Sequence, residues 1–140
     1  MTDDREALRR LVEEDGDEDA AATLADLAVH EGDTELLRFL LDNGSERAGD
    51  LLATLAAGSG DVDTLRLLVD DGNEEAAALL TALAARTGDE ELLGWLVDSG
   101  VEEAADLWAE IASARGDLET VARMADEGSD VAVRILRDRS

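Results

Sequence analysis

The sequence predicts an all-α fold, an open α-solenoid of five 28-residue helix-turn-helix repeats. Three observations predict it. Glycines recur in two series that each step by 28 residues, apolar residues recur at helical spacing between them, and polar residues replace core residues only in the end copies. We therefore expect a single helical-repeat domain over residues 1–140, with repeats at about 4–31, 32–59, 60–87, 88–115 and 116–140.

The glycine series mark where each helix is expected to end. A Gly-Asp dipeptide recurs at residues 32–33, 60–61, 88–89 and 116–117, and a second series lies at Gly16, Gly44, Gly72, Gly100 and Gly128. The intervals leave room for one helix of about ten residues and one of about thirteen in each repeat. Glycine can adopt the left-handed conformation that ends a helix, and the following Asp can accept hydrogen bonds from the amides that open the next helix.

The second helix of each repeat is expected to have its own cap. Residues with capping side chains follow the second glycine series at Asp17, Ser45, Asn73 and Ser129. Val101 breaks this pattern in the fourth copy. We therefore expect Gly100 to cap that helix.

Equivalent positions in the five copies predict the core. Three positions on the first helix are expected to form the core, with Arg9 and Arg123 as polar exceptions in the end copies: Arg9, Leu37, Leu65, Leu93 and Val121; Val12, Leu40, Leu68, Leu96 and Met124; and Leu11, Phe39, Leu67, Trp95 and Arg123. Three more follow on the second helix: alanine at residues 20, 48, 76, 104 and 132; Leu24, Leu52, Leu80, Trp108 and Leu136; and Leu27, Leu55, Leu83, Ile111 and Arg139. Arginine at the ends of these series is typical of terminal repeats, whose outer faces meet solvent.

The charge of the chain limits its partners. It has 36 acidic residues against 12 arginines, no lysine and a formal net charge of -24. Such a surface repels nucleic acids and anionic membranes, so we expect neither as a partner. Abundant acids without lysine resemble the proteins of salt-loving archaea, and a designed sequence could share that bias. There is no cysteine, and the acidic start MTDDREAL is unlike a signal peptide, so we expect a soluble, cytoplasmic protein. The acidic residues 13–19 and the basic last helix could pair head to tail between molecules, but exposed ion pairs are weak and we expect a monomer.

Part of every internal repeat resembles the ankyrin repeat. LAARTGDEELLGWLVDSG at residues 83–100 is similar to the ankyrin pattern LAAxxGHxExVxxLLxxG, and related stretches start at Leu27 and Leu55. The resemblance implies stacked helical hairpins that bind protein partners. Ankyrin units have 33 residues and a β-hairpin finger, whereas this period is 28 and proline is absent. Only the concave helical face is therefore left as a place for a protein partner.

Two groups of residues could suggest metal chemistry. His30 is the only histidine, near the end of a helix, where it is favourable to the helix dipole and has no recurring partner. Asp15, Asp17 and Asp19 resemble the start of a calcium loop, but its sixth and twelfth positions hold Ala20 and Asp26 instead of Gly and Glu. We interpret these acids as a helix start, and we expect weak, diffuse attraction of cations rather than a metal site.

Other candidate groups also have structural interpretations. The carboxylate pairs at 74–75, 90–91 and 102–103 fall in first turns of helices, Ser59, Thr87, Ser99 and Ser113 have no nearby histidine, and GSG at 58–60 lacks a phosphate-loop lysine. Trp95 and Trp108 stand at expected core positions. We expect no catalytic, cofactor-binding or metal-binding residue, no cofactor and no small-molecule ligand.

These observations favour a designed or artificial helical-repeat scaffold that is not an enzyme. The alternative is an ankyrin-like protein interaction module from a salt-rich cytoplasm. An exposed apolar or aromatic patch on the internal repeats would favour the interaction module, because a bare scaffold needs none.

Overall fold

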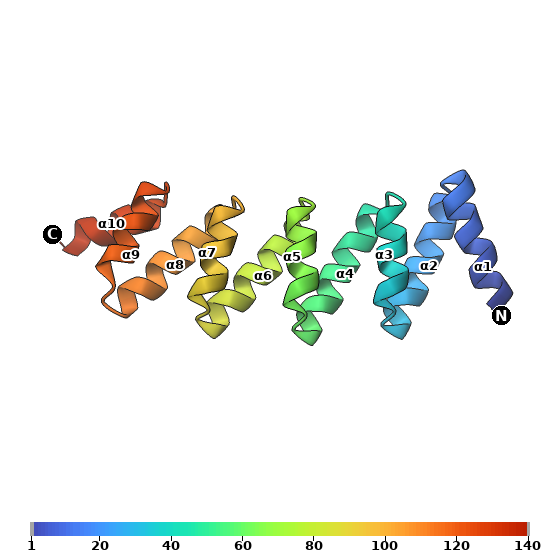
Figure 1. Cartoon of the computed structure of the whole chain (residues 1–140), viewed down its shortest axis with the longest axis horizontal. Coiled ribbons are helices and arrows are strands. Elements are labelled where there is room, and N and C mark those ends of the chain that lie inside the picture. The colour runs from blue at the N-terminus through green and yellow to red at the C-terminus, as the bar shows by residue number, and fades with distance from the viewer. Residues whose placement is uncertain (1, 140) are drawn as a thin grey trace. The chain divides into compact units, whose positions relative to one another are not determined.

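The computed structural model describes residues 2–139, which form ten α-helices and one π-helical turn and contain no strand (Figure 1). The predicted fold class, an all-α solenoid of helix-turn-helix repeats, is confirmed by this content and by the packing of successive helices. The chain groups into two compact units, Met1–Ala76 (unit 1) and Ala77–Ser140 (unit 2). Residues 1 and 140 of the predicted domain lie outside the described residues, and the single domain stays a prediction.

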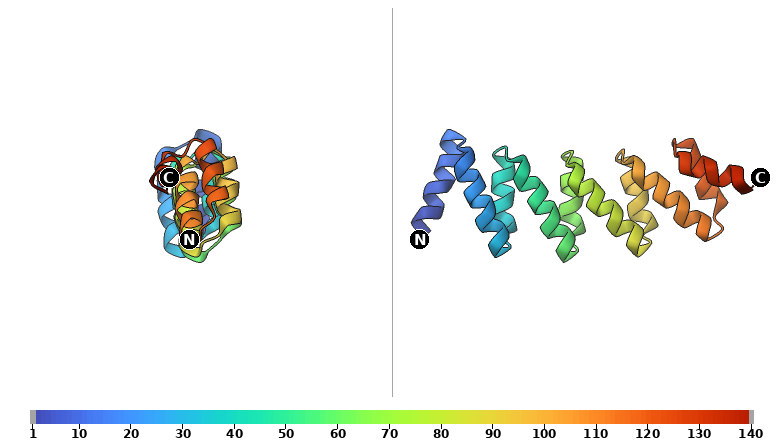
Figure 2. Two further views of the ribbon diagram at one scale, coloured as in Figure 1. Left: turned by 90° about the vertical axis from the view of Figure 1, so that its left-hand side faces the viewer. Right: turned by 180° about the vertical axis from the view of Figure 1, so that it is seen from behind.

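Unit 1 contains the first two repeats and most of the third. Its elements are α1 (Thr2–Arg10), the π-helical turn η1 (Leu11–Asp15), α2 (Glu18–Glu31), α3 (Thr34–Asp42), α4 (Glu46–Ser59), α5 (Val62–Asp70) and the first turn of α6 (Glu74–Thr87). Each helix from α1 to α4 packs against the next one, and α2 also contacts α4. The shorter helices α3 and α5 therefore lie on one side of the unit and the longer α2 and α4 on the other, as the view from behind in Figure 2 shows.

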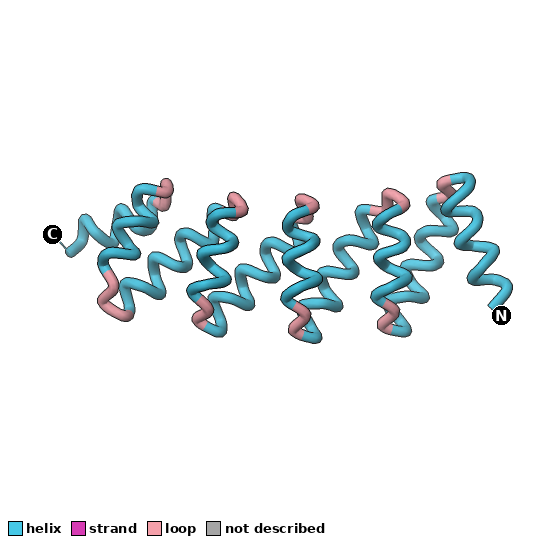
Figure 3. The backbone as a smooth tube through the Cα atoms, in the orientation of Figure 1, coloured by secondary structure: helices cyan, strands magenta, loops and turns pink. Residues whose placement is uncertain are grey.

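Unit 2 repeats this arrangement. After the rest of α6 it contains α7 (Glu90–Asp98), α8 (Glu102–Ala114), α9 (Leu118–Asp126) and α10 (Asp130–Arg139). Here α7, α8, α9 and α10 pack in sequence, and α8 also contacts α10. Figure 3 shows the loops as short segments, and within each unit the Gly-Asp turns lie at one edge and the other turns at the opposite edge.

The Gly-Asp junction works as predicted, and the turn at Gly60 and Asp61 shows how. Gly60 has a φ of 74°, which a residue with a side chain rarely adopts. The Asp61 amide then donates to the Ala56 carbonyl at 2.8 Å, which closes α4, while the Asp61 carboxylate accepts from the Thr64 amide at 3.1 Å, which opens α5. The same cap forms at Asp33, Asp89 and Asp117.

The caps of the second helices are confirmed in four copies. The side chains of Asp17, Ser45, Asn73 and Ser129 each accept a backbone amide of the following turn. The expectation that Gly100 caps the fourth copy is wrong. Val101 occupies the cap position of α8 without a side-chain hydrogen bond, and its carbonyl accepts from the Ala104 amide at 3.1 Å. Gly100, with a φ of 92°, instead serves the end of α7, as the glycines at equivalent positions do.

The first two predicted core positions on the first helix are confirmed in the internal repeats. Leu37, Leu65 and Leu93 are fully buried, as are the five recurring alanines of the second helix to within a few per cent. The third position was wrongly assigned to the core, because Leu11 is 37% exposed and Leu67 is 53% exposed. At 100° per residue, this position lies roughly 110° from the centre of the buried face, on the flank of the helix.

The alanines at 28, 56, 84 and 112 are also buried, as the helical spacing from Ala76 to Ala84 predicts, and two further buried positions were missed by the sequence pattern. One contains Leu36, Thr64 and Leu92 on the first helix, and the other contains Ala25, Ala53, Thr81 and Ala109 on the second helix. Each series contains a threonine, which counts as polar in the sequence although its hydroxyl group is hydrogen-bonded in the fold. The Thr81 hydroxyl, for example, donates to the Ala77 carbonyl at 2.7 Å.

Candidate functional site

The metal candidates of the sequence lie at helix ends. His30 is exposed in the last turn of α2. The Asp17 carboxylate accepts from the amides of Asp19 and Ala20 at 3.0 and 3.1 Å, so it is the cap of α2. Within residues 2–139, no three His, Cys, Asp or Glu side chains gather in a way that could hold a metal ion.

The carboxylate candidates are used in caps or lie on the surface. Glu74, Glu91 and Glu103 are exposed, and Glu90 is half-buried with its Oε2 atom 2.9 Å from Arg115 Nη1. The Thr64 hydroxyl donates to Asp61 at 2.6 Å and, together with the Thr64 amide, lowers the pKa of that carboxyl below its usual range. Thr120 lowers the pKa of Asp117 in the same way.

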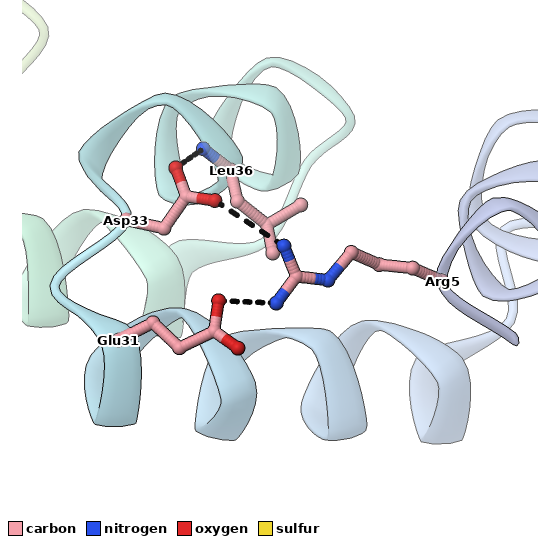
Figure 4. Close-up of polar contacts among 4 residues, drawn as sticks. All are labelled: Arg5, Glu31, Asp33 and Leu36. Carbon is pink, nitrogen blue, oxygen red and sulfur yellow. Dashed lines mark hydrogen bonds and ion pairs between the residues drawn. The ribbon is translucent and has the colours of Figure 1, made fainter. Parts of the chain in front are cut away.

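An arginine of α1 connects the first helix of unit 1 to the two helices that follow. Arg5 of α1 forms an ion pair with Glu31, and its Nη1 atom lies 3.7 Å from Asp33 Oδ2 (Figure 4). The bond to Glu31 and the two negative charges raise the pKa of Arg5 above its usual value. Because Asp33 also accepts from the Leu36 amide at 3.1 Å, one guanidinium connects α1 to the junction of α2 and α3.

A groove with leucine walls lies in unit 1 and is the first candidate surface for a partner. Its volume is about 180 Å³, and we call it the leucine groove; its lining residues are Arg38, Leu41, Asp42, Leu52, Thr64, Leu67, Leu68 and Asp71. Leu52 and Leu68 are buried, Leu41 is half-buried, and Leu67 is the most exposed large apolar residue among those described. Arg38 donates to the Thr64 hydroxyl at 3.2 Å, which ties α3 to the start of α5 beside the groove.

An acidic hollow adjoins the leucine groove. Its volume is about 450 Å³, and we call it the acidic recess; it is lined by Leu41, Glu46, Asp50, Leu68, Asp71, Gly72, Asn73, Glu74 and Glu75. The two spaces share Leu41, Leu68 and Asp71, so they lie next to each other. Five of the nine lining residues of the recess are acidic and none is basic.

Asn73 fixes the floor of the acidic recess. Its Nδ2 atom donates to Asp50 at 3.3 Å, and its Oδ1 atom accepts from the Ala76 amide at 2.7 Å. Gly49 leaves room for this bridge, since a Cβ atom there would lie 2.9 Å from Asn73 Nδ2. The sequence predicts only the capping role of Asn73, because its second role depends on contact between two repeats.

The equivalent of the leucine groove in unit 2 is filled by the protein itself. Fifty-six residues further along the chain, Trp108 replaces Leu52, Gly94 replaces Arg38 and Arg123 replaces Leu67. The Arg123 guanidinium lies 4.7 Å from the centre of the Trp108 ring, and a Cβ atom on Gly94 would lie 3.3 Å from that ring. Trp108 packs against the buried cluster of Ala105, Ala109, Ala112, Val121, Met124 and Ala132, so its predicted role in packing is confirmed, although it is half-buried.

The acidic recess also has an equivalent in unit 2. A hollow of about 260 Å³ is lined by Glu102, Ala105, Asp106, Glu127, Gly128, Ser129 and Asp130. The Ser129 hydroxyl donates to Asp106 at 2.6 Å, as Asn73 donates to Asp50 in unit 1. The bridge from a cap to the acid of the preceding second helix is therefore a shared feature of the two units.

Comparisons with known proteins do not suggest a function for the chain, so the functional interpretation depends on this geometry. No protein-family model, no curated protein and no solved structure matches the chain. None of the helices in residues 2–139 has the length and apolar character needed to cross a membrane.

Proposed function

We propose that this chain is a helical-repeat scaffold of designed or artificial origin, without catalytic activity. The main observation behind the proposal is that its recurring polar residues cap helices. Asp33, Asp61, Asp89 and Asp117 all accept a backbone amide at the start of a helix. Side chains that could perform chemistry thus recur with the structural period and serve the turns of the fold.

The pKa shifts support a structural role for these carboxyls. General acid catalysis near neutral pH needs a carboxyl with a raised pKa. Asp61 and Asp117 have lowered pKa values because hydroxyl and amide donors stabilise their charged forms. The net charge of -24 supports the further proposal that neither nucleic acid nor an anionic membrane is a partner.

Duplicating one repeat tests the scaffold proposal. A second copy of residues 60–87 would be inserted after Thr87, and unfolding would be followed by circular dichroism. A chain built from stackable repeats should accept the extra copy and gain stability, with a Tm higher by at least about 2 °C. A lower Tm, or loss of helical content, would show that the repeats are not interchangeable structural units.

The second candidate function is that of an ankyrin-like protein interaction module from a salt-rich cytoplasm. One observation favours it: Leu67, 53% exposed on an internal repeat, lies at the leucine groove. Contiguous exposed apolar surface marks interaction sites, and Leu67 adjoins the apolar walls of a groove instead of standing alone. Ankyrin-like hairpins without fingers would present such a groove on their helical face.

A further inference from the structure

We infer that the leucine groove and acidic recess of unit 1 bind a basic peptide segment, with one aliphatic side chain in the groove and flanking Arg or Lys residues over the recess. This inference rests on the second proposed function, the interaction module. It specifies the surface and the chemistry of the partner.

The groove provides a place for an aliphatic side chain. Leu41, Leu52 and Leu68 give it apolar walls, and Leu67 is 53% exposed beside them. A volume of about 180 Å³ suits a single side chain and is too small for a whole helix. An apolar group that entered it would also cover Leu67, and the removal of both surfaces from water favours binding.

The charges beside the groove select a cationic partner. The five acids of the recess are Glu46, Asp50, Asp71, Glu74 and Glu75, and Asp42 lines the groove itself. Unit 1 as a whole has 22 acidic residues against 6 arginines, a net charge of -16. Such a field speeds the approach of basic segments and rejects acidic ones, which would place like charges together.

Unit 2 already contains the two kinds of group that the proposed peptide would supply, an apolar side chain and a cation. There the apolar group that fills the equivalent groove is Trp108, and the cation that covers it is Arg123 at 4.7 Å. Unit 1 lacks both groups at those positions, where Leu52 and Leu67 stand, and its own lining arginine, Arg38, donates to the Thr64 hydroxyl. A peptide with an aliphatic residue and neighbouring arginines would supply to unit 1 what unit 2 already contains.

A second copy of this chain is a weaker candidate for the occupant. Helix α10 carries Arg134, Arg137 and Arg139 together with the exposed Val133, so it has the required types of residue. However, Arg139 already donates to the Ser113 carbonyl at 3.3 Å, and two copies that each carry a charge of -24 repel each other. A peptide without this acidic background is favoured.

The test is isothermal titration calorimetry of the full chain with the synthetic peptide RRLRR, at about 0.02 M and 0.15 M salt. Two matched peptides, RRARR and EELEE, test the apolar anchor and the charge. We expect RRLRR to bind, RRARR to bind at least about tenfold more weakly, EELEE not to bind, and higher salt to weaken binding. Equal binding of RRLRR and RRARR would overturn the inference, since it would indicate diffuse attraction to the acidic surface.

Variants locate the site. Leu67→Arg places at the groove the cation that unit 2 has at Arg123, and it should weaken RRLRR binding at least about tenfold through lost apolar contact and added repulsion. The matched control Val133→Arg makes the same change at an exposed residue of unit 2 and should change affinity less than about twofold. Equal losses in both variants would overturn the location in unit 1.

Two further measurements separate this inference from the other proposals. Circular dichroism of each variant shows whether it is folded, so a folded chain that does not bind RRLRR overturns the inference while leaving the scaffold proposal intact. Analytical ultracentrifugation of the free chain detects the alternative occupant. A dimer that Leu67→Arg abolishes would show that a second copy, and not a peptide, fills the groove.

Discussion

The same position of the repeat is an open groove in unit 1 and is filled by a side chain in unit 2. In unit 1 the space between α3, α4 and α5 is lined by leucines, with Leu67 largely exposed. In unit 2 the equivalent position has Trp108, with Arg123 stacked on its ring and Gly94 making room for it. Six of the eight residues that line the groove differ between the two copies, and three of these differences, at Leu52, Arg38 and Leu67, introduce the ring, the room for it and the cation that covers it in unit 2.

The largest expected effect is the loss of stability when a buried leucine is truncated, compared with truncation of the exposed leucine next to it. Leu68→Ala should cost about 2 to 5 kcal/mol of unfolding free energy, because Leu68 is only 2% exposed, and Met124→Ala at the equivalent position of unit 2 should cost a similar amount. Leu67→Ala should cost less than about 0.5 kcal/mol. Denaturant unfolding measures all three. A large cost at Leu67 would show that its side chain is part of the core and not the edge of a binding groove.

The next largest effect is expected when an aspartate cap is removed; such caps occur in both units. Asp61→Ala should cost about 0.5 to 2 kcal/mol at pH 7, because the amide and hydroxyl of Thr64 lose their acceptor. The pKa of Asp61 is lowered in the folded state. The stabilisation is therefore complete above the unfolded value near pH 4, and it is lost as the pH falls through the lowered folded value.

Unfolding measurements at several pH values test this cap. The gap between wild type and Asp61→Ala should narrow below about pH 4. Asp70→Ala is the matched control, since it removes the same charge from the last turn of α5, where an acid makes no favourable interaction with the helix dipole. If Asp70→Ala were as costly as Asp61→Ala, the loss at Asp61 would not be specific to the cap.

A smaller effect should report the packing of Gly94 on Trp108. Gly94→Ala gains helix propensity but brings a Cβ atom to 3.3 Å from the indole ring. In a Trp108→Leu background that contact is absent, so Gly94→Ala should be more favourable there by about 0.5 to 1 kcal/mol. A double-mutant cycle by chemical unfolding measures this coupling. Additive effects would mean that the glycine is not there to accommodate the tryptophan.

The smallest expected effect is a difference in salt response between the units. Raising salt from about 0.01 M to 1 M should raise the Tm, because the excess of acids is screened. Unit 1 has a charge of -16 from 22 acids and 6 arginines, whereas unit 2 has -8 from 14 acids and 6 arginines. Amide hydrogen exchange should therefore slow more in unit 1, by about 0.2 to 1 kcal/mol of opening free energy. An equal or opposite response would count against the repulsion argument.

Local features of the fold could be predicted from the sequence because they depend on neighbouring residues. Gly60 and Asp61 predict their turn, since one supplies a positive φ and the other an acceptor three residues before the amide that it caps. The periodic leucines and alanines similarly predict the buried face. Val101 was misjudged because a residue without a capping side chain can still occupy the cap position when the turn around it is set by equivalent contacts.

Features that depend on contact between repeats were not predictable in the same way. Leu67 was assigned to the core because it aligns with Phe39 and Trp95, but the flank of a short helix is covered only if the neighbouring residues reach it. The leucine groove follows from that exposure. The Asn73 bridge to Asp50 likewise joins residues 23 positions apart, and no local pattern in the chain marks it.

The placement of the two indoles has a practical consequence. Trp95 and Trp108 both belong to unit 2, and unit 1 has none. Intrinsic fluorescence of the native chain is therefore a spectroscopic reporter of that half alone, while far-ultraviolet ellipticity sums over both. Melting curves recorded by these two signals would coincide if the halves unfold in one cooperative step, and they would separate if each half melts on its own.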